Sequence, residues 1–353
     1  PTGSISILFS ILLLILFGFA ALAVDIGYMA VAKSELQGAA DAGARAGAVR
    51  LYNKGVGPDW TTGQQRAEEL AEMNRTTGNA VILLSAPEAG YWNATTGGQT
   101  IQSPVGFTPT AYDFPAIKVT ASRTGVGDGG PITTLFARTL NIDSAPMSAS
   151  AIAVVSGPGY VDQRNLFPFV MSQCMYDTYW NTAATPPGPF LVNGKQPEFK
   201  IGNKEGDPTC GTNTGVWTDL KEQKPAGNNY TKTLIDSFGT DTPFLVSAPV
   251  AIGETIFISA GDPASAYGAT RDCIKDRASC QFVTVAVVSN AENSNSKDRP
   301  RPTDVLAFAC LELIGANQGQ RTIQVKMAQN CDPPGSGGIG PDYGFKPRPR
   351  IVQ

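Results

Sequence analysis

The sequence predicts an α+β protein with a long hydrophobic N-terminal helix, a small α+β domain and a β-sandwich-like domain held by disulfides. Three observations support this fold class. The first 24 residues carry no charge, segments with helix and strand periodicity follow them, and all six cysteines lie after residue 166. The boundaries we expect are 1–55 for the helix, 56–155 for the small domain, 156–165 for a linker, 166–340 for the β-rich domain and 341–353 for an extended tail.

The first 24 residues include the segment Ile5 to Val24, which is long enough to cross a membrane as a helix. At the helical rise of about 1.5 Å per residue, twenty residues match the hydrocarbon thickness of a bilayer. The alternative is a cleaved signal peptide, whose apolar stretch is usually shorter and is followed by a small-residue cleavage site. No helix breaker follows Val24, so we predict one helix from about Ser4 to about Tyr52.

The second half of this predicted helix carries small residues at four-residue spacing, which places them on shared faces. Such residues let helices approach closely, and in lipid this packing replaces the hydrophobic drive. An ordinary helix lying on its own domain needs small residues too, and the sequence does not decide between the two. The candidate helix-packing residues are Ala23, Gly27, Ser34, Gly38, Ala42, Gly43, Ala46 and Gly47.

Asp25 stands where the apolar run ends. A carboxylate at such a boundary either stays solvated or finds a cationic partner, for which Lys33 or Arg45 could serve across a helix interface. The solvated boundary charge is the simpler expectation, because nothing in the sequence fixes the depth of this residue.

The small domain is predicted from short periodic segments. Thr61 to Asn74 has the apolar spacing of a helix, and Ala80 to Leu84, Ala116 to Ser122 and Ala145 to Val155 read as strands. The turn-rich string SGPGYVDQRN then suggests the linker. Beyond it, short apolar runs separated by Gly, Pro, Asn and Asp are typical of a β-sandwich. These runs are Phe244 to Val250, Thr255 to Ser259, Phe282 to Val288, Val305 to Ile314 and Thr322 to Met327.

The cysteines form an even set, without a C-x-x-C motif and without any histidine: Cys174, Cys210, Cys273, Cys280, Cys310 and Cys331. A zinc site would need closer pairs, so we expect disulfides and an oxidising compartment. The sequence leaves the connectivity open, although order along the chain favours pairing neighbours: Cys174 with Cys210, Cys273 with Cys280, and Cys310 with Cys331.

Composition narrows the function classes. The formal net charge of −3 provides no basic field for a nucleic-acid backbone, and the absence of histidine removes the commonest general base and transition-metal ligand. The sequence has no G-x-S-x-G elbow, phosphate-binding loop or dinucleotide fingerprint. We therefore expect no enzyme activity, no cofactor, no metal site and no nucleic-acid partner.

The basic C-terminal string YGFKPRPRIVQ alternates proline with other residues and favours an extended chain. It can be a disordered tail. It can also be an arm that pairs with the sheet of a neighbouring subunit, because Ile351 and Val352 end it with strand formers.

The segment SISILFSILLLILFGFAALAVDIGYMAVAKSELQGAADAGARAGA, residues 4–48, resembles the N-terminal segment of TadE/TadG-like proteins of the bacterial Tad (Flp) pilus machinery. That segment combines a hydrophobic helix, a VD-x-G step and a helix of the form K-x-x-L-Q-x-A-A-D-A-A-A-L-A-G-A. Residues 116–155 more loosely resemble the strand, short helix and strand that follow in such proteins. The matching positions of the first segment are Val24, Asp25, Gly27, Lys33, Leu36, Gln37, Ala39, Ala40, Asp41, Ala42, Ala46, Gly47 and Ala48.

Two features depart from related patterns. Ile5 occupies the place where substrates of the prepilin peptidase that resemble type IV pilins carry a Glu, so processing by that route is not implied. Larger TadG-like proteins often carry a von Willebrand A domain with a D-x-S-x-S metal site, and the sequence has no such string.

The resemblance implies a pilin-like helix and a structural subunit of an extracellular pilus-like filament, either a pilin or a minor pilin. Such a subunit would polymerise with copies of itself and contact other pilus components. Before assembly it would lie in the cytoplasmic membrane with its domains exported. The alternative function is an inner-membrane-anchored protein that presents a periplasmic assembly, adhesion or binding domain.

Overall fold

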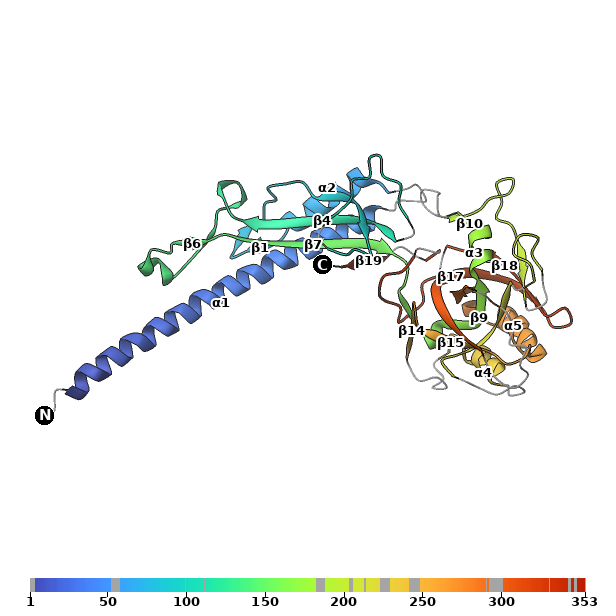
Figure 1. Cartoon of the computed structure of the whole chain (residues 1–353). Coiled ribbons are helices and arrows are strands. Elements are labelled where there is room, and N and C mark those ends of the chain that lie inside the picture. The colour runs from blue at the N-terminus through green and yellow to red at the C-terminus, as the bar shows by residue number, and fades with distance from the viewer. Residues whose placement is uncertain are drawn as a thin grey trace. The chain divides into compact units, whose positions relative to one another are not determined.

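The computed structural model divides into two compact units, each described here by itself (Figure 1). Unit 1 comprises residues 1–109, 113–155 and 349–353, and unit 2 comprises residues 110–112 and 156–348. In chain order, unit 2 is therefore an insertion into unit 1. The structure describes residues 4–51, 58–98, 100–110, 112–181, 188–202, 206–212, 214–222, 229–240, 248–289, 291, 301–329, 331–341, 344–345 and 348–352.

Unit 1 begins with helix α1 (Ser4–Leu51), which runs without interruption as its composition predicts. Its first part is uncharged and apolar, and its second part is rich in alanine, a strong helix former that offsets the glycines. The predicted end at Tyr52 lies outside the described residues. Helix α2 (Trp60–Glu72) follows, and its N-cap Asp59 accepts hydrogen bonds from the backbone nitrogen and the hydroxyl of Thr62.

The sheet of unit 1 has the strand order β19-β7-β4-β3, with α1 and α2 packed against it (Figure 1). Strands β4 and β7 lie where the sequence predicts them. The strand predicted at residues 80–84 is wrong, because only Asn79–Ala80 (β2) pairs there, with Arg75–Thr76 (β1). The sheet strands are β3 (Glu88–Asn93), β4 (Asp113–Arg123), β7 (Met147–Ser156) and β19 (Arg348–Ile351).

Between β4 and β7 the chain makes a narrow projection, which we call the arm and define as residues 132–145. Its base is the antiparallel pair β5 (Ile132–Thr133) and β6 (Ser144–Ala145), and its tip contains the short helix η2 (Ala137–Leu140). A further short helix, η1 (Val126–Asp128), precedes the arm. Figure 1 shows the arm, in green, extending beyond the end of the sheet beside α1.

The last part of the predicted C-terminal tail, residues 348–352, contains a strand of this same sheet. The backbone nitrogen of Val352 donates to the carbonyl oxygen of Ile152 at 2.9 Å, and β19 pairs with β7 of its own chain. These residues are therefore not a disordered tail, and the sheet with which they pair is that of their own chain.

Unit 2 is built on one sheet in which the five strands β17, β15, β13, β9 and β16 close into a ring, while β18 and β12 extend from β17. In the described residues its order is β12-β18-β17-β15-β13-β9-β16, and β16 also pairs with the long strand β17. The β-rich, disulfide-containing region is confirmed, but five of its strands close into a ring rather than stacking as two separate sheets. The strands are β9 (Leu166–Ser172), β12 (Phe199–Ile201), β13 (Gly215–Leu220), β15 (Thr255–Ile258), β16 (Phe282–Val288), β17 (Arg301–Asn317) and β18 (Thr322–Met327).

Residues 156–165, predicted as a linker, are folded into unit 2. Strand β8 (Tyr160–Asp162) pairs with β14 (Pro249–Ala251), and η3 (Gln163–Asn165) leads directly into β9. Residues 244–247 of the run predicted at 244–250 lie outside the described residues. The remaining elements of unit 2 are α3 (Gln173–Tyr179), β10 (Trp180–Asn181), β11 (Gly188–Pro189), α4 (Tyr230–Ser237), α5 (Ala264–Asp276) and η4 (Ala278–Cys280).

The core of unit 2 is aromatic. The ring of Trp217, fully buried, meets the rings of Phe169 and Tyr267 edge to face, with centroids 5.0 Å apart in each pair. Three disulfides surround this core, in the pairing that chain order favours. They join Cys174 to Cys210, Cys273 to Cys280 and Cys310 to Cys331, with Cα–Cα distances of 5.6, 5.8 and 5.5 Å.

Candidate assembly surface on the N-terminal helix

The first half of α1 exposes its apolar side chains. In the described structure, every side chain of residues 7–24 is exposed except that of Ala21, which is half-buried. Leu14, for example, is 75% exposed. The helix is long and apolar enough to cross a membrane. A stripe this size is unfavourable in water, so lipid or another protein covers it.

The second half of α1 has one face buried in unit 1. Its fully buried apolar side chains are Ala32, Leu36, Ala39, Ala40, Ala44, Ala48 and Leu51. On the same face, Gly43 and Gly47 lie against α2. A Cβ added to Gly43 would meet the carbonyl oxygen of Ala67 at 2.7 Å, and one added to Gly47 would meet the carbonyl oxygen of Gly63 at 2.7 Å. This pair of glycines therefore serves packing within the chain, the ordinary alternative that the sequence left open.

The opposite face of α1 carries most of the other predicted helix-packing residues. Ala23, Gly27, Ser34 and Gly38 are exposed, whereas Ala42 and Ala46 are half-buried. Among the described residues, no neighbouring atom lies within 4 Å of a Cβ placed on Gly27 or Gly38. The predicted set of eight thus divides into a buried glycine pair, four exposed small residues and two half-buried alanines.

Asp25 is buried, with 1% of its surface exposed. Its carboxylate accepts hydrogen bonds from the backbone nitrogens of Leu135 at 2.7 Å, Phe136 at 3.0 Å and Ala137 at 2.6 Å. Both expectations for this residue are wrong here, since it is neither a solvated charge nor paired with Lys33 or Arg45. Successive N–H groups that converge on one carboxylate compensate its charge and fix the first turn of η2.

Two further polar residues of α1 bind strand β7 where β19 does not pair with it. The Lys33 ammonium donates to the carbonyl oxygen of Ser148, and the Gln37 amide donates to that of Ser150 at 3.2 Å. The sequence predicts neither contact: it offers Lys33 as a possible partner of Asp25, and Gln37 as a position shared with the family pattern. The available signal was their four-residue spacing, which places them on one side of the helix.

These contacts complete the outer edge of β7. Successive carbonyl groups of a strand point to opposite sides, so those of every second residue point the same way. The carbonyl oxygens of Ser148, Ser150 and Ile152 all point away from β4. The first two accept from α1, and the third accepts from the nitrogen of Val352. An edge that would otherwise invite pairing with another chain is therefore covered within unit 1.

A second buried carboxylate, that of Asp128, holds the turn before the arm. It accepts from the backbone nitrogens of Thr124 at 2.6 Å and Gly125 at 2.8 Å, and from the hydroxyl of Ser122 at 2.9 Å. Burial raises the pKa of this carboxyl, but the hydrogen bonds to the ionised form outweigh burial and lower the pKa to about 2.

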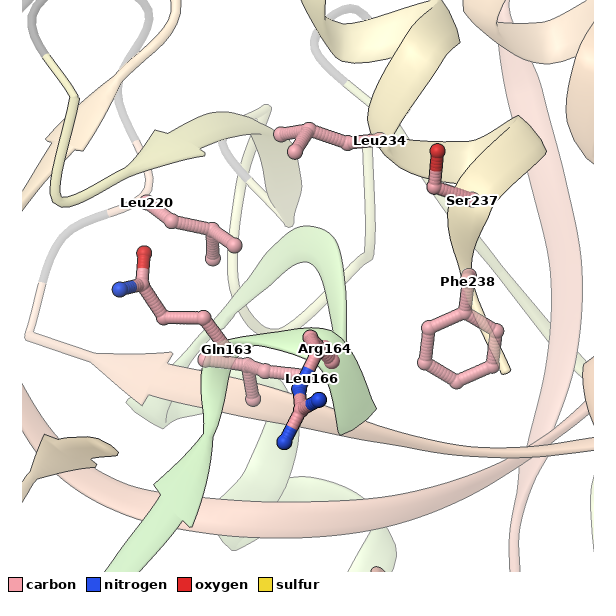
Figure 2. Close-up of a pocket in the computed structure, with 7 residues that line it drawn as sticks. All are labelled: Gln163, Arg164, Leu166, Leu220, Leu234, Ser237 and Phe238. Carbon is pink, nitrogen blue, oxygen red and sulfur yellow. The ribbon is translucent and has the colours of Figure 1, made fainter. Parts of the chain in front are cut away.

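One small cavity of unit 2 lies next to η3. Gln163, Leu166 and Leu220 line it from one side and Leu234 and Phe238 from the other, as Figure 2 shows. Its volume is about 10 Å³, the size of one water molecule. Within the described ranges, no group of three or more His, Cys, Asp or Glu side chains is placed to hold a metal ion.

Two family models match the N-terminal part of the chain. One, described as Flp pilus-assembly TadE/G-like, matches residues 3–50, and the other, described as Tad-like Flp pilus-assembly, matches residues 37–153. Residues 3–153 are thus a TadE/TadG-like region of the Tad pilus system. Neither a curated protein nor a solved structure matches the chain.

The matched residues coincide with most of unit 1, including α1, α2, β3, β4, the arm and most of β7. The role of the chain lies in the Flp pilus system, and both family descriptions concern pilus assembly rather than catalysis. The motif residues Asp25, Lys33 and Gln37 attach α1 to unit 1 through the contacts above. The family pattern therefore describes how the helix is held on its own domain.

Proposed function

We propose that this protein is a structural subunit of a pilus-like filament, a pilin or minor pilin that assembles through the exposed face of α1. Its partners are copies of itself and other pilus components. Before assembly, α1 lies in the cytoplasmic membrane with units 1 and 2 on the exported side, where the three disulfides form.

The observation that carries this proposal is the continuation of the apolar, small-residue face beyond Asp25. A membrane anchor accounts for exposed apolar residues about as far as Asp25, which is bonded to the folded part of unit 1. Yet Val31, six residues further along α1, is 55% exposed and lies on one face of the helix with the open Gly27 and Gly38. Apolar side chains with small neighbours, at the level of a folded domain, suit close packing of another helix.

The second candidate function is a membrane-anchored periplasmic assembly or adhesion protein. The length of the protruding segment favours it. From Ser4 to Val24, α1 extends about 32 Å at the helical rise, close to the thickness of a bilayer core. The two functions use the same helix and differ in whether its apolar residues finally contact protein or lipid.

The deciding experiment compares Gly27→Leu and Gly38→Leu with Gln65→Leu, which adds the same side chain to an exposed position of α2. Cells are sheared, and the protein is quantified in the released surface material and in the inner membrane. The filament function predicts wild-type protein in the sheared fraction and its loss in both glycine variants but not in Gln65→Leu. Wild-type protein confined to the inner membrane would establish the anchored function instead.

A further inference from the structure

The tip of the arm carries large apolar side chains that unit 1 does not cover. Leu135 is 52% exposed, Phe136 48%, Leu140 73% and Ile142 53%. They fall within eight residues of chain, on and beside the four-residue helix η2. Such a concentration of exposed apolar groups on a narrow projection indicates a surface that meets an apolar environment.

The position of this tip is fixed relative to the apolar helix. Asp25, the first residue after the segment Ile5 to Val24, binds the backbone nitrogens of Leu135, Phe136 and Ala137. The tip therefore lies at the level on α1 where the membrane-spanning length ends. Figure 1 shows the arm and the protruding half of α1 on the same side of the sheet of unit 1.

We infer that the arm tip is a membrane-contacting element, which enters the boundary between headgroups and acyl chains of the exported leaflet while α1 spans the bilayer. The four apolar side chains occupy the acyl boundary. Arg138, exposed among them, reaches lipid phosphates, while Asp143 directly precedes the base strand β6 in the chain. The membrane-binding free energy of such a shallow contact grows with the apolar area that it buries. The contact also sets the height and rotation of the domain above the bilayer.

Because the arm tip lies against the end of the spanning segment, we take lipid as the environment that covers its apolar side chains. Whatever surrounds Val24 in the membrane also surrounds groups held within hydrogen-bonding distance of Asp25, the next residue. The inference goes beyond the proposed function, because it concerns the membrane stage and holds whether or not the chain later polymerises.

The test uses the full chain reconstituted in vesicles of phosphatidylethanolamine and phosphatidylglycerol that contain nitroxide-labelled lipid. All six native cysteines are paired, so a thiol-reactive fluorophore labels Thr139→Cys at the tip. The matched control is Thr108→Cys, an exposed position beside Phe107, whose ring packs on Tyr91 at the other end of the sheet. The eleven residues of β4 separate the two ends by about 35 Å.

We expect strong quenching of the Thr139 label by headgroup-proximal nitroxides and little quenching of the Thr108 label. Adding Leu140→Ser and Ile142→Ser should reduce the tip signal to the control level, with unchanged thermal unfolding because both side chains are exposed. Equal quenching at both labels, or none at either, would overturn the inference. So would a tip label unquenched in vesicles but shielded from a water-soluble quencher in sheared filaments, which would assign the tip to a contact between subunits. Filament yield plays no part in the vesicle measurement, so each proposal can fail separately.

Discussion

The Oδ2 atom of Asp25 lies 2.6 Å from the backbone nitrogen of Ala137, a residue 112 positions later in the chain. This contact, with its two neighbours, attaches the last turn of the apolar segment to the folded part of unit 1. The place where α1 leaves its domain is thus defined by a buried carboxylate and not only by a change in composition.

Replacing that carboxylate should release the arm. We expect Asp25→Ala to cost about 1–3 kcal/mol, because three backbone donors lose a charged acceptor. The measurement is limited trypsin digestion of the detergent-solubilised chain, with cleavage after Arg138 appearing earlier than in the wild type. Asp41→Ala is the control, since the Asp41 carboxylate accepts a hydrogen bond from Gln37, one turn earlier in the same helix. Equal cleavage in both variants would contradict the capping role.

The two glycine faces of α1 should respond oppositely to an added methyl group. Gly47→Ala forces a contact with the Gly63 carbonyl and Ala67, so we expect a loss of about 1–3 kcal/mol in unfolding free energy. Gly38→Ala meets open space in the described structure and should gain up to about 1 kcal/mol from helix propensity. Denaturant unfolding of the full chain in detergent compares them. A stabilised Gly47→Ala would show that α1 and α2 are not closely packed.

All six cysteines should be oxidised in the exported protein. Intact-mass spectrometry with and without reductant should show a gain of six hydrogens, two for each of the three disulfides. The double variant Cys174→Ser and Cys210→Ser should lose about 2–4 kcal/mol of stability, because it releases a loop with a sequence separation of 36 residues. Alkylation of the unreduced protein at any cysteine would disprove the prediction.

Acid should weaken unit 1 through Asp128. Its pKa is depressed from 3.8 to about 2, so the stabilisation is fully present above pH 3.8 and is lost as the pH falls toward 2. The folded carboxylate is the favoured form, and protonation removes acceptors from the Thr124 and Gly125 nitrogens. We expect Asp128→Asn to lower stability at pH 7 and to flatten the pH dependence in this window. A thermal melt series on both proteins checks this, and parallel pH profiles would rule the assignment out.

Local composition predicts α1 well, because a long uncharged run and an alanine-rich run both favour a helix regardless of what they contact. It fails for β3, where Gly90 sits so close to the Gln102 carbonyl that a Cβ would lie 2.1 Å from that oxygen. It also misses β9, whose Pro168 argues against a central strand. The residue lies in a register shift between the pairings of Leu166 and Val170, where the ladder is irregular.

The candidate site shows the same limit. The apolar stretch and the four-residue spacing of small residues are visible in the sequence. Which glycines face α2 and which face outward depends on the rotation of α1 on its domain, and that rotation is set by contacts with distant residues. Lys33 with Ser148 and Asp25 with Ala137 each join positions more than a hundred residues apart. Periodicity within one helix cannot supply such pairings.

The insertion of unit 2 between β7 and β19 also has a mechanical consequence. The chain departs from one strand of the unit 1 sheet and returns through the strand beside it. A pulling force applied along α1 would thus be borne by the packing of the helix on unit 1 and by hydrogen bonds between neighbouring strands. The covalent path through unit 2 begins and ends on adjacent strands, so this unit lies off the line of tension. It can vary in size or sequence, or carry a foreign epitope, without changing the part of the molecule that resists the load.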